Sequence, residues 1–86
     1  MIITICGSKR FSNEIYSLAD NLRSLNNTVY CPMFFSSLDM DTLIQTHRYK
    51  ILASDIVIVC NHDGYIGEHT KDEIEFAKKS NKPILF

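Results

Sequence analysis

Short apolar runs alternate with longer segments of helical period along this chain of 86 residues. The runs occupy residues 2–6 (IITIC), 28–31 (TVYC), 56–60 (IVIVC) and 83–86 (PILF). The first and third are β-branched and continuously apolar, which is typical of strands covered on both faces of a sheet. Each run is also too short for a stable helix, so the sequence predicts four strands.

Three segments between these runs predict helices, because their apolar residues recur at helical spacing. The first spans residues 13–25, and Ser12 or Asn13 is expected to cap it. The second begins at Asp39 or Asp41 and ends at Ala53, and the third spans residues 70–80. Strands separated by helices need right-handed crossovers, which favour a parallel sheet. We therefore expect a single α/β domain over residues 1–86, with three layers and a four-stranded parallel sheet in the order 2-1-3-4, flavodoxin-like or Rossmann-like.

Charge and hydropathy exclude two classes of partner. A protein that binds a nucleic acid polymer usually carries a strong basic excess, whereas the formal net charge here is −1. The longest apolar runs are about five residues, and a membrane-spanning helix needs about 20. We therefore expect no nucleic acid polymer and no membrane as a partner.

The three cysteines, Cys6, Cys31 and Cys60, are odd in number and form no CxxC motif. They fit small buried hydrophobes in a reducing compartment, and a reactive thiol at Cys6 is the alternative. No signal peptide precedes the first strand, so a cytoplasmic location is expected. A core this small also favours self-association into a homodimer or larger assembly.

The fold itself indicates where a ligand would bind. In open parallel sheets the site lies beyond the carboxyl ends of the strands, where the strand order reverses. In the order 2-1-3-4 that point lies between the first and third strands. The loops that follow these two strands, residues 6–11 and 61–70, are therefore the predicted site.

The first loop reads Cys6-Gly7-Ser8-Lys9-Arg10-Phe11. Glycine allows close approach of the backbone, serine offers a hydroxyl, and the two basic residues offer positive charge beside a helix N-terminus. This combination suits a phosphate or a sugar hydroxyl. It is neither GxGxxG nor a P-loop, and a tight turn with solvated basic residues is the alternative.

The second loop is rich in carboxylates and leads into the third helix. Its candidate binding or catalytic residues are Asn61, Asp63, Gly64, Tyr65, Gly67, Glu68 and Thr70. Glu73 follows them, and a carboxylate near a helix N-terminus stays ionised and can attack an electrophilic sugar carbon. The alternative is that Thr70 to Glu73 form a capping box, in which the glutamate only bonds back to the cap residue.

Three other groups of residues have weaker interpretations. His62 and His69 with Asp63 or Glu68 fit no common metal spacing, so we predict no metal site. His47 is expected to be a packed or interface histidine. Phe34 and Phe35 are candidates for stacking on a nucleobase or for packing in the core or a dimer.

Two blocks of the sequence, residues 3–11 and 54–85, together resemble the nucleoside 2-deoxyribosyltransferase superfamily, which includes the 2'-deoxynucleoside 5'-monophosphate N-glycosidases. The first block is a strand that ends in a Gly-Ser loop. The second contains an Asp-led apolar strand (residues 55–58), a helix turn reading Glu-Ile-Glu-Phe-Ala (residues 73–77) and Asn-Lys-Pro (residues 81–83) before the last strand. The match covers nearly the whole chain in order, and residues 28–38 match least.

The resemblance implies a function and a set of roles. Glu73 would attack the anomeric carbon of a 2-deoxyribosyl group, expel the base and form a covalent sugar ester, which water or a second base then resolves. Gly7 and Ser8 would hold the sugar 5' end, and Lys9 or Arg10 would favour a 5'-phosphate. Candidates for protonating the base are Asp63, Glu68 and His62. The family's base-binding aspartate has no clear match in this loop, because its two candidates, Asn61 and Asp63, are both offset from the expected position. No metal or organic cofactor is implied.

Two other functions remain open. The short chain and the altered base loop also suit a non-catalytic nucleotide-binding module, such as a sensor or a sequestering protein. A weaker alternative is an NAD-related glycohydrolase, which also uses a glutamate against an anomeric carbon. If the chain forms a homodimer, the second helix and the loop of residues 33–38 are the expected interface.

Overall fold

The computed structural model describes residues 1–34 and 37–86, and its centre is a four-stranded parallel sheet in the order β2-β1-β3-β4. The strands are β1 (Ile2–Gly7), β2 (Thr28–Tyr30), β3 (Ile56–Cys60) and β4 (Ile84–Leu85). The pairing of β1 with β3 is the longest and runs from Ile3 opposite Ile56 to Gly7 opposite Cys60. The predicted α/β class, parallel sheet and strand order are confirmed.

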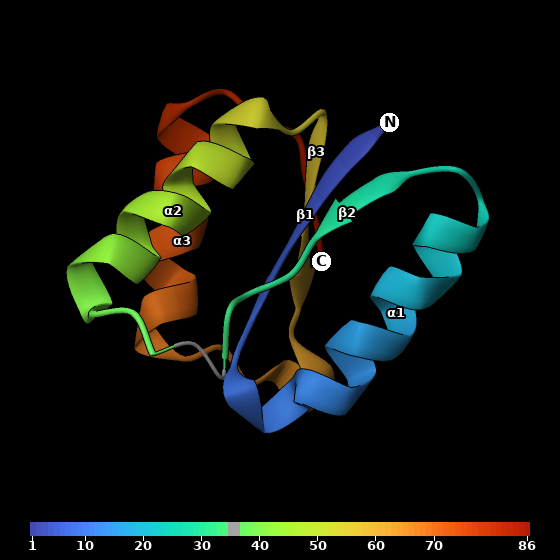
Figure 1. Ribbon diagram of the computed structural model, residues 1–86. Helices are drawn as coiled ribbons and strands as arrows, with labels where there is room; N and C mark the ends of the chain where they lie inside the picture. Colours follow the sequence, from blue (N-terminus) through green and yellow to red (C-terminus); the bar gives the residue numbers. More distant parts are fainter. Residues whose placement is uncertain (35–36) are drawn as a thin grey trace.

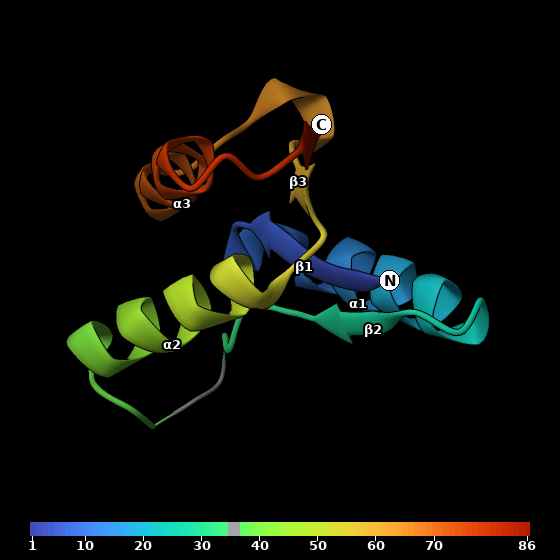
Figure 2. The ribbon, with the colours of Figure 1, turned by 90° about the horizontal axis from the view of Figure 1, so that it is seen from above.

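Three helices cover the two faces of this sheet (Figures 1 and 2). They are α1 (Ser12–Ser24), α2 (Met40–Ala53) and α3 (Glu68–Lys79). From β1 the chain crosses to one side of the sheet through α1, and it returns across β1 to β3 and β4 through α2 and α3. Right-handed crossovers in opposite directions lie on opposite faces, so α1 covers one face while α2 and α3 lie together on the other. No helix within residues 1–34 and 37–86 is long and apolar enough to cross a membrane.

Strand side chains alternate between two separate apolar clusters, one on each face. Under α1 lie Ile3 and Ile5 with residues of the helix and β2, and under α2 and α3 lie Cys6, Val57 and Val59. All of these side chains are at most 5% exposed. Cys6 therefore belongs to the face that α2 and α3 cover, and the prediction of a buried Cys6 holds.

Two helices begin elsewhere than the sequence predicts. The N-cap of α1 is Phe11, which makes no side-chain cap bond, so the predicted cap at Ser12 or Asn13 is wrong. A 3-10 turn, η1 (Lys9–Phe11), instead precedes α1, and Ser8 caps that turn. Helix α3 begins at Glu68 after an N-cap at Gly67, whereas the pattern predicts a start near Thr70.

The earlier start of α3 decides between the two interpretations of Glu73. Thr70 lies inside the helix and is 2% exposed, so it is not an N-cap and forms no capping box with Glu73. Glu73 is the sixth residue of α3, in its second turn. Its side chain is therefore not used by the helix terminus.

Candidate functional site

A cavity of about 500 Å³ lies beside the carboxyl end of β1, and the later part of the loop after β3 borders it. Its walls come from the segment after β1, the segment after β2, helix α2 and the start of α3. From the predicted site residues, the lining includes Gly7, Ser8, Lys9, Tyr65, Gly67, Glu68, Thr70 and Glu73. The cavity volume is in the range that small-molecule sites occupy.

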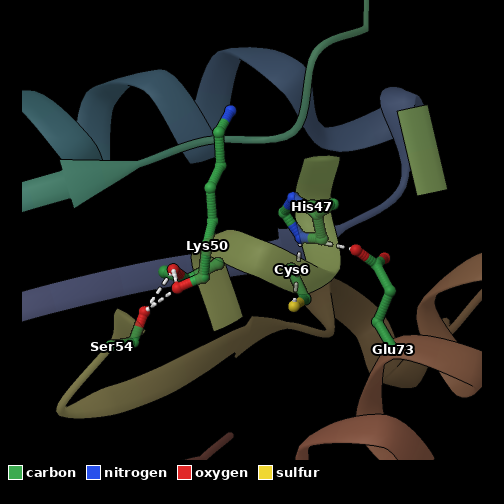
Figure 3. A network of polar contacts seen from close by, with 6 residues as sticks. Cys6, His47, Lys50, Ser54 and Glu73 are labelled. Atoms are coloured by element: carbon green, nitrogen blue, oxygen red, sulfur yellow. Dashed lines mark hydrogen bonds and ion pairs between the residues drawn. The ribbon is translucent and has the colours of Figure 1, made fainter. Parts of the chain in front are cut away.

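The most tightly held polar pair at the cavity joins α2 to α3 (Figure 3). Nε2 of His47 lies 2.5 Å from Oε2 of Glu73, and the two side chains are 10% and 20% exposed. A carboxylate oxygen only accepts hydrogen bonds, so Nε2 of His47 carries the proton and donates it. The bond turns the Glu73 carboxylate toward the cavity wall and restricts its rotamers.

Cys6 lies behind this pair, at the end of β1. Its Sγ is 3.5 Å from Nε2 of His47, and the residue has no exposed surface. Burial raises the pKa of the Cys6 thiol, and the negative charge of Glu73 raises that pKa further. A thiol–imidazole–carboxylate triad uses both ring nitrogens, whereas here one nitrogen faces both groups. This geometry disfavours the alternative of a reactive thiol at Cys6.

The position of His47 follows from how the C-terminal end of α2 is attached to β1. The Thr4 hydroxyl donates to the Lys50 carbonyl at 3.1 Å, and the Ser54 hydroxyl donates to the same carbonyl at 2.7 Å. The two hydroxyls also contact each other, and Figure 3 shows the Lys50–Ser54 side of this network. We call Thr4, Lys50 and Ser54 the hydroxyl anchor. It holds α2 against β1 less than one helical turn from His47, because Lys50 is three residues further along the helix.

The segment after β1 has a packing role in addition to its place in the cavity. A Cβ atom on Gly7 would lie 2.8 Å from Cδ1 of Ile15 and 3.1 Å from Cβ of Cys60. A larger residue at this position would therefore crowd the packing of α1 on the strands, whether or not a ligand is bound. The Ser8 hydroxyl accepts a hydrogen bond from the Arg10 amide at 3.3 Å and also lines the cavity. The sequence predicts that this loop leads directly into the N-terminus of α1, but the η1 turn lies between Ser8 and that helix.

Six predicted site residues are outside the cavity lining. They are Cys6, Arg10, Asn61, His62, Asp63 and Gly64. The Arg10 guanidinium stacks over the Tyr65 ring at 3.8 Å, while Asp63 has a side chain that is 88% exposed and lies 3.8 Å from His62. Asp63 and Gly64 both have positive φ, in the 3-10 turn η2 (His62–Gly64). This part of the loop makes a turn beside the cavity and does not form its wall.

Several lining residues were not expected from the sequence. They are Pro32, Met33, Met40, Leu43, Ile44, His47, Arg48, His69 and Asp72. Most lie on α2 or just before it, and they would follow from the crossover rule, which puts α2 beside α3 over the same strand ends. Phe34 lines the cavity as well, and its ring meets Tyr16 edge-on at 6.1 Å. Phe35 lies outside the described residues.

The fold and this site define an α/β protein with a small-molecule cavity at the reversal point of a parallel sheet. No protein-family model matches the sequence, and no curated protein matches it. Among solved structures, the fold is similar to that of a 2-desoxiribosyltransferase from Leishmania mexicana, with a TM-score of 0.72 and 19% sequence identity. The similarity covers 96% of this chain and 61% of that one, so the chain spans less than two thirds of its structural neighbour. At this identity the likeness shows a deoxyribosyltransferase-like fold.

Proposed function

We propose that this protein acts on the N-glycosidic bond of a 2'-deoxynucleoside or its 5'-monophosphate, with Glu73 as nucleophile. The observation that carries the proposal is the position of Glu73, whose carboxylate lines the cavity and is held there by His47. The sequence resemblance and the fold of the structural neighbour, a 2-desoxiribosyltransferase, support the same class of substrate.

The reaction proceeds by double displacement. Oε2 of Glu73 accepts the hydrogen bond from His47, and Oε1 attacks the anomeric carbon of the sugar. The bond from that carbon to the base breaks, its electron pair leaves with the base, and a sugar ester forms on Glu73. Water or a second base then attacks the same carbon and releases the carboxylate. His47 acts as a positioning residue throughout, because it holds the nucleophile in one orientation.

Two groups of lining residues suit the two ends of such a substrate. Gly7, Ser8 and Lys9 form one wall, where a backbone amide, a hydroxyl and an ammonium group favour a 5'-phosphate. Met33, Phe34 and Met40 add an apolar surface for the base. The base also needs a proton as it leaves, and we assign this task to Glu68 or Asp72, because these carboxylates line the cavity and Asp63 does not.

The test is to incubate the protein with a panel of deoxynucleosides and their monophosphates and to follow free base by chromatography. Glu73→Gln keeps the shape of the side chain and removes the nucleophile, so the rate should fall by about three orders of magnitude or more. Glu75→Gln is the matched control, since Glu75 is on the same helix and its side chain is 64% exposed. Acid-quenched protein should carry a deoxyribosyl adduct on Glu73 by mass spectrometry. Base release that persists in Glu73→Gln excludes the assigned nucleophile.

A second candidate is a non-catalytic nucleotide-binding module. It is favoured by one observation: Asn61 and Asp63, the nearest counterparts of the base-binding aspartate in the resembled family, are outside the cavity lining. Calorimetry with the same panel separates the two functions. Binding with full recovery of intact ligand supports the module, whereas loss of ligand supports the enzyme. Including NAD in the panel tests for a glycohydrolase, which would release nicotinamide.

A further inference from the structure

We propose that Cys6, His47 and Glu73 form a binding site for Zn²⁺, and that bound zinc blocks the cavity. The binding claim stands independently of the proposed function, and only the consequence for catalysis rests on it. One thiol, one imidazole and one carboxylate converge here from β1, α2 and α3, and their ligand atoms all lie within 4.8 Å of one another. Within residues 1–34 and 37–86, these three residues are the one group of three histidine, cysteine or acidic side chains placed closely enough to hold a metal ion.

The donors lie close enough together for a tetrahedral ion once the Glu73 carboxylate moves, because the third spacing, from Sγ of Cys6 to that carboxylate, is at most 4.8 Å. Typical bonds from zinc to sulfur, nitrogen and oxygen place the donor atoms roughly 3.3–3.6 Å apart in a tetrahedron. Sγ of Cys6 and Nε2 of His47 are already 3.5 Å apart. Nε2 of His47 and Oε2 of Glu73 are 2.5 Å apart, so the carboxylate must move outward by somewhat under an ångström. Glu73 is the most exposed of the three and borders the cavity, which gives it room to move.

The chemistry of the donors selects the ion. Thiolate and imidazole ligands favour zinc and disfavour Mg²⁺ and Ca²⁺, which take oxygen ligands. Zinc replaces the proton between His47 and Glu73, the histidine proton shifts to Nδ1, and the Cys6 thiol releases its proton to solvent. Two negative ligands then balance the charge of the ion, so a buried site carries no net charge. Three protein ligands leave the fourth position open toward the cavity, as in zinc sites that bind water or substrate.

Binding would disable the nucleophile that the proposed function assigns. Zinc bound to Oε2 withdraws electron density from the whole carboxylate, so Oε1 becomes a weaker nucleophile, and the ion with its fourth ligand would occupy space that the sugar needs. The expected result is reversible inhibition of base release by zinc, with recovery when a chelator is added.

The experiment uses Co²⁺ as a visible probe and Zn²⁺ as its competitor. Wild-type protein should bind one Co²⁺ with a thiolate-to-cobalt charge-transfer band and the visible bands of tetrahedral cobalt, and Zn²⁺ should abolish both. Cys6→Ser should lose the charge-transfer band. His47→Gln and Glu73→Gln should weaken binding by more than about 10–100-fold, the loss typical of an outer-shell partner.

Matched controls come from the other two cysteines. Cys31 and Cys60 are free thiols outside this cluster, so Cys31→Ser and Cys60→Ser should keep the band and the affinity. Glu73→Gln remains informative if Cys6→Ser fails to fold, because its side chain is partly exposed and keeps its shape. No thiolate band in the wild-type protein, or a band that depends on Cys60 or Cys31, overturns the site.

The two proposals fail separately. A cobalt band without base release from any nucleotide supports the metal site and contradicts the proposed enzyme. Base release without a cobalt band supports the proposed enzyme and contradicts the metal site. Base release that zinc does not inhibit, in protein that shows the band, contradicts the blocking role.

Discussion

At the scale of single residues, the side chain of His47 links three elements of the sheet and helices. It bonds to Glu73 on α3 and touches Cys6 on β1 from its own place on α2. Its contribution is separable from that of Glu73, because His47 holds the carboxylate and does not itself meet the sugar in the proposed reaction.

The first prediction concerns this positioning role. His47→Leu removes the donor, and a hydrogen bond to a charged group is worth about 1.5–3 kcal/mol, so kcat/KM for base release should fall about 10–150-fold. The loss should be in kcat, and His47→Gln should restore part of it because its amide can donate. Steady-state kinetics measure both, with Gln45→Leu, at an exposed position of the same helix outside the cavity lining, as control. A loss confined to KM would indicate a binding contact instead.

Gly7 gives a second prediction at this scale. An alanine Cβ would press on Cδ1 of Ile15 and on Cys60 at the distances given above. Gly7→Ala should therefore lower the free energy of unfolding by about 1–3 kcal/mol, the usual cost of overpacking. Ile15→Val deletes the crowding methyl group, so the double variant Gly7→Ala/Ile15→Val should be less destabilised than the sum of the two single changes. Denaturant unfolding tests this, and strict additivity would show that Ile15 is not the obstacle.

At the scale of the helices, the residues at which each one begins show what the sequence could and could not predict. Helix α2 begins at Met40, within the predicted start at Asp39 or Asp41, and Asp39 caps it. Ser12 and Thr70 also carry side chains that commonly cap helices, yet both lie inside helices. Thr70 is buried by packing, and the Ser8 turn displaces the start of α1. Tertiary packing therefore overrides the local signal at Thr70, and the preceding turn overrides it at Ser12.

The Asp39 cap leads to a third prediction, on pH. Its Oδ1 accepts a hydrogen bond from the Thr42 amide at 2.8 Å, and that bond lowers the pKa of the Asp39 carboxyl below its ordinary value of 3.8. A lowered pKa in the folded state means that the stabilisation is complete above pH 3.8 and is lost as the pH falls through the folded-state pKa. Asp39→Asn keeps an acceptor that does not titrate. Thermal unfolding should show a smaller difference between the two proteins below pH 3.8 than at neutral pH.

The exposed Asp41 provides the comparison for this prediction. It is in the first turn of α2 and is not the cap residue. Asp41→Asn should leave the acid dependence of the wild-type protein unchanged. An equal loss of acid dependence in both variants would assign it to the general charge of the helix terminus.

At the scale of the whole molecule, the topology determines which residues meet. The apolar runs and the helical segments between them are sufficient to predict four parallel strands and their order. The same crossover rule puts α2 and α3 on one face, so a contact between them was predictable, but the helical period does not fix which residue of α2 faces Glu73. His47 is packed as predicted, at 8% exposure, but that prediction did not include its contact with Glu73. Which residues line the cavity depends on the paths of the loops, and local sequence signals do not specify those paths. The turn of residues 62–64, which places Asp63 outside the lining, is an example.

The fourth prediction concerns assembly. We expect a homodimer or larger assembly, because α2 leaves Tyr49 and Leu52 at 73% and 48% exposure on its outer surface. Light scattering at micromolar concentration should give more than the monomer mass, and Leu52→Asp should shift the protein toward monomer. Leu25→Asp, at an exposed site after α1, is the control and should change nothing. A monomeric wild-type protein would contradict this expectation.

The hydroxyl anchor has a consequence for motion. Thr4, Lys50 and Ser54 secure only the C-terminal end of α2, while Met40, Leu43 and Ile44 near its beginning line the cavity. Amide hydrogens of α2 should therefore exchange with deuterium in a gradient, slowest near Ile51 and fastest near Met40. Ser54→Ala should flatten that gradient by speeding the slow end. In such a motion the N-terminal end of α2 would move away from the cavity and admit a ligand, while the C-terminal end stays bound to the sheet.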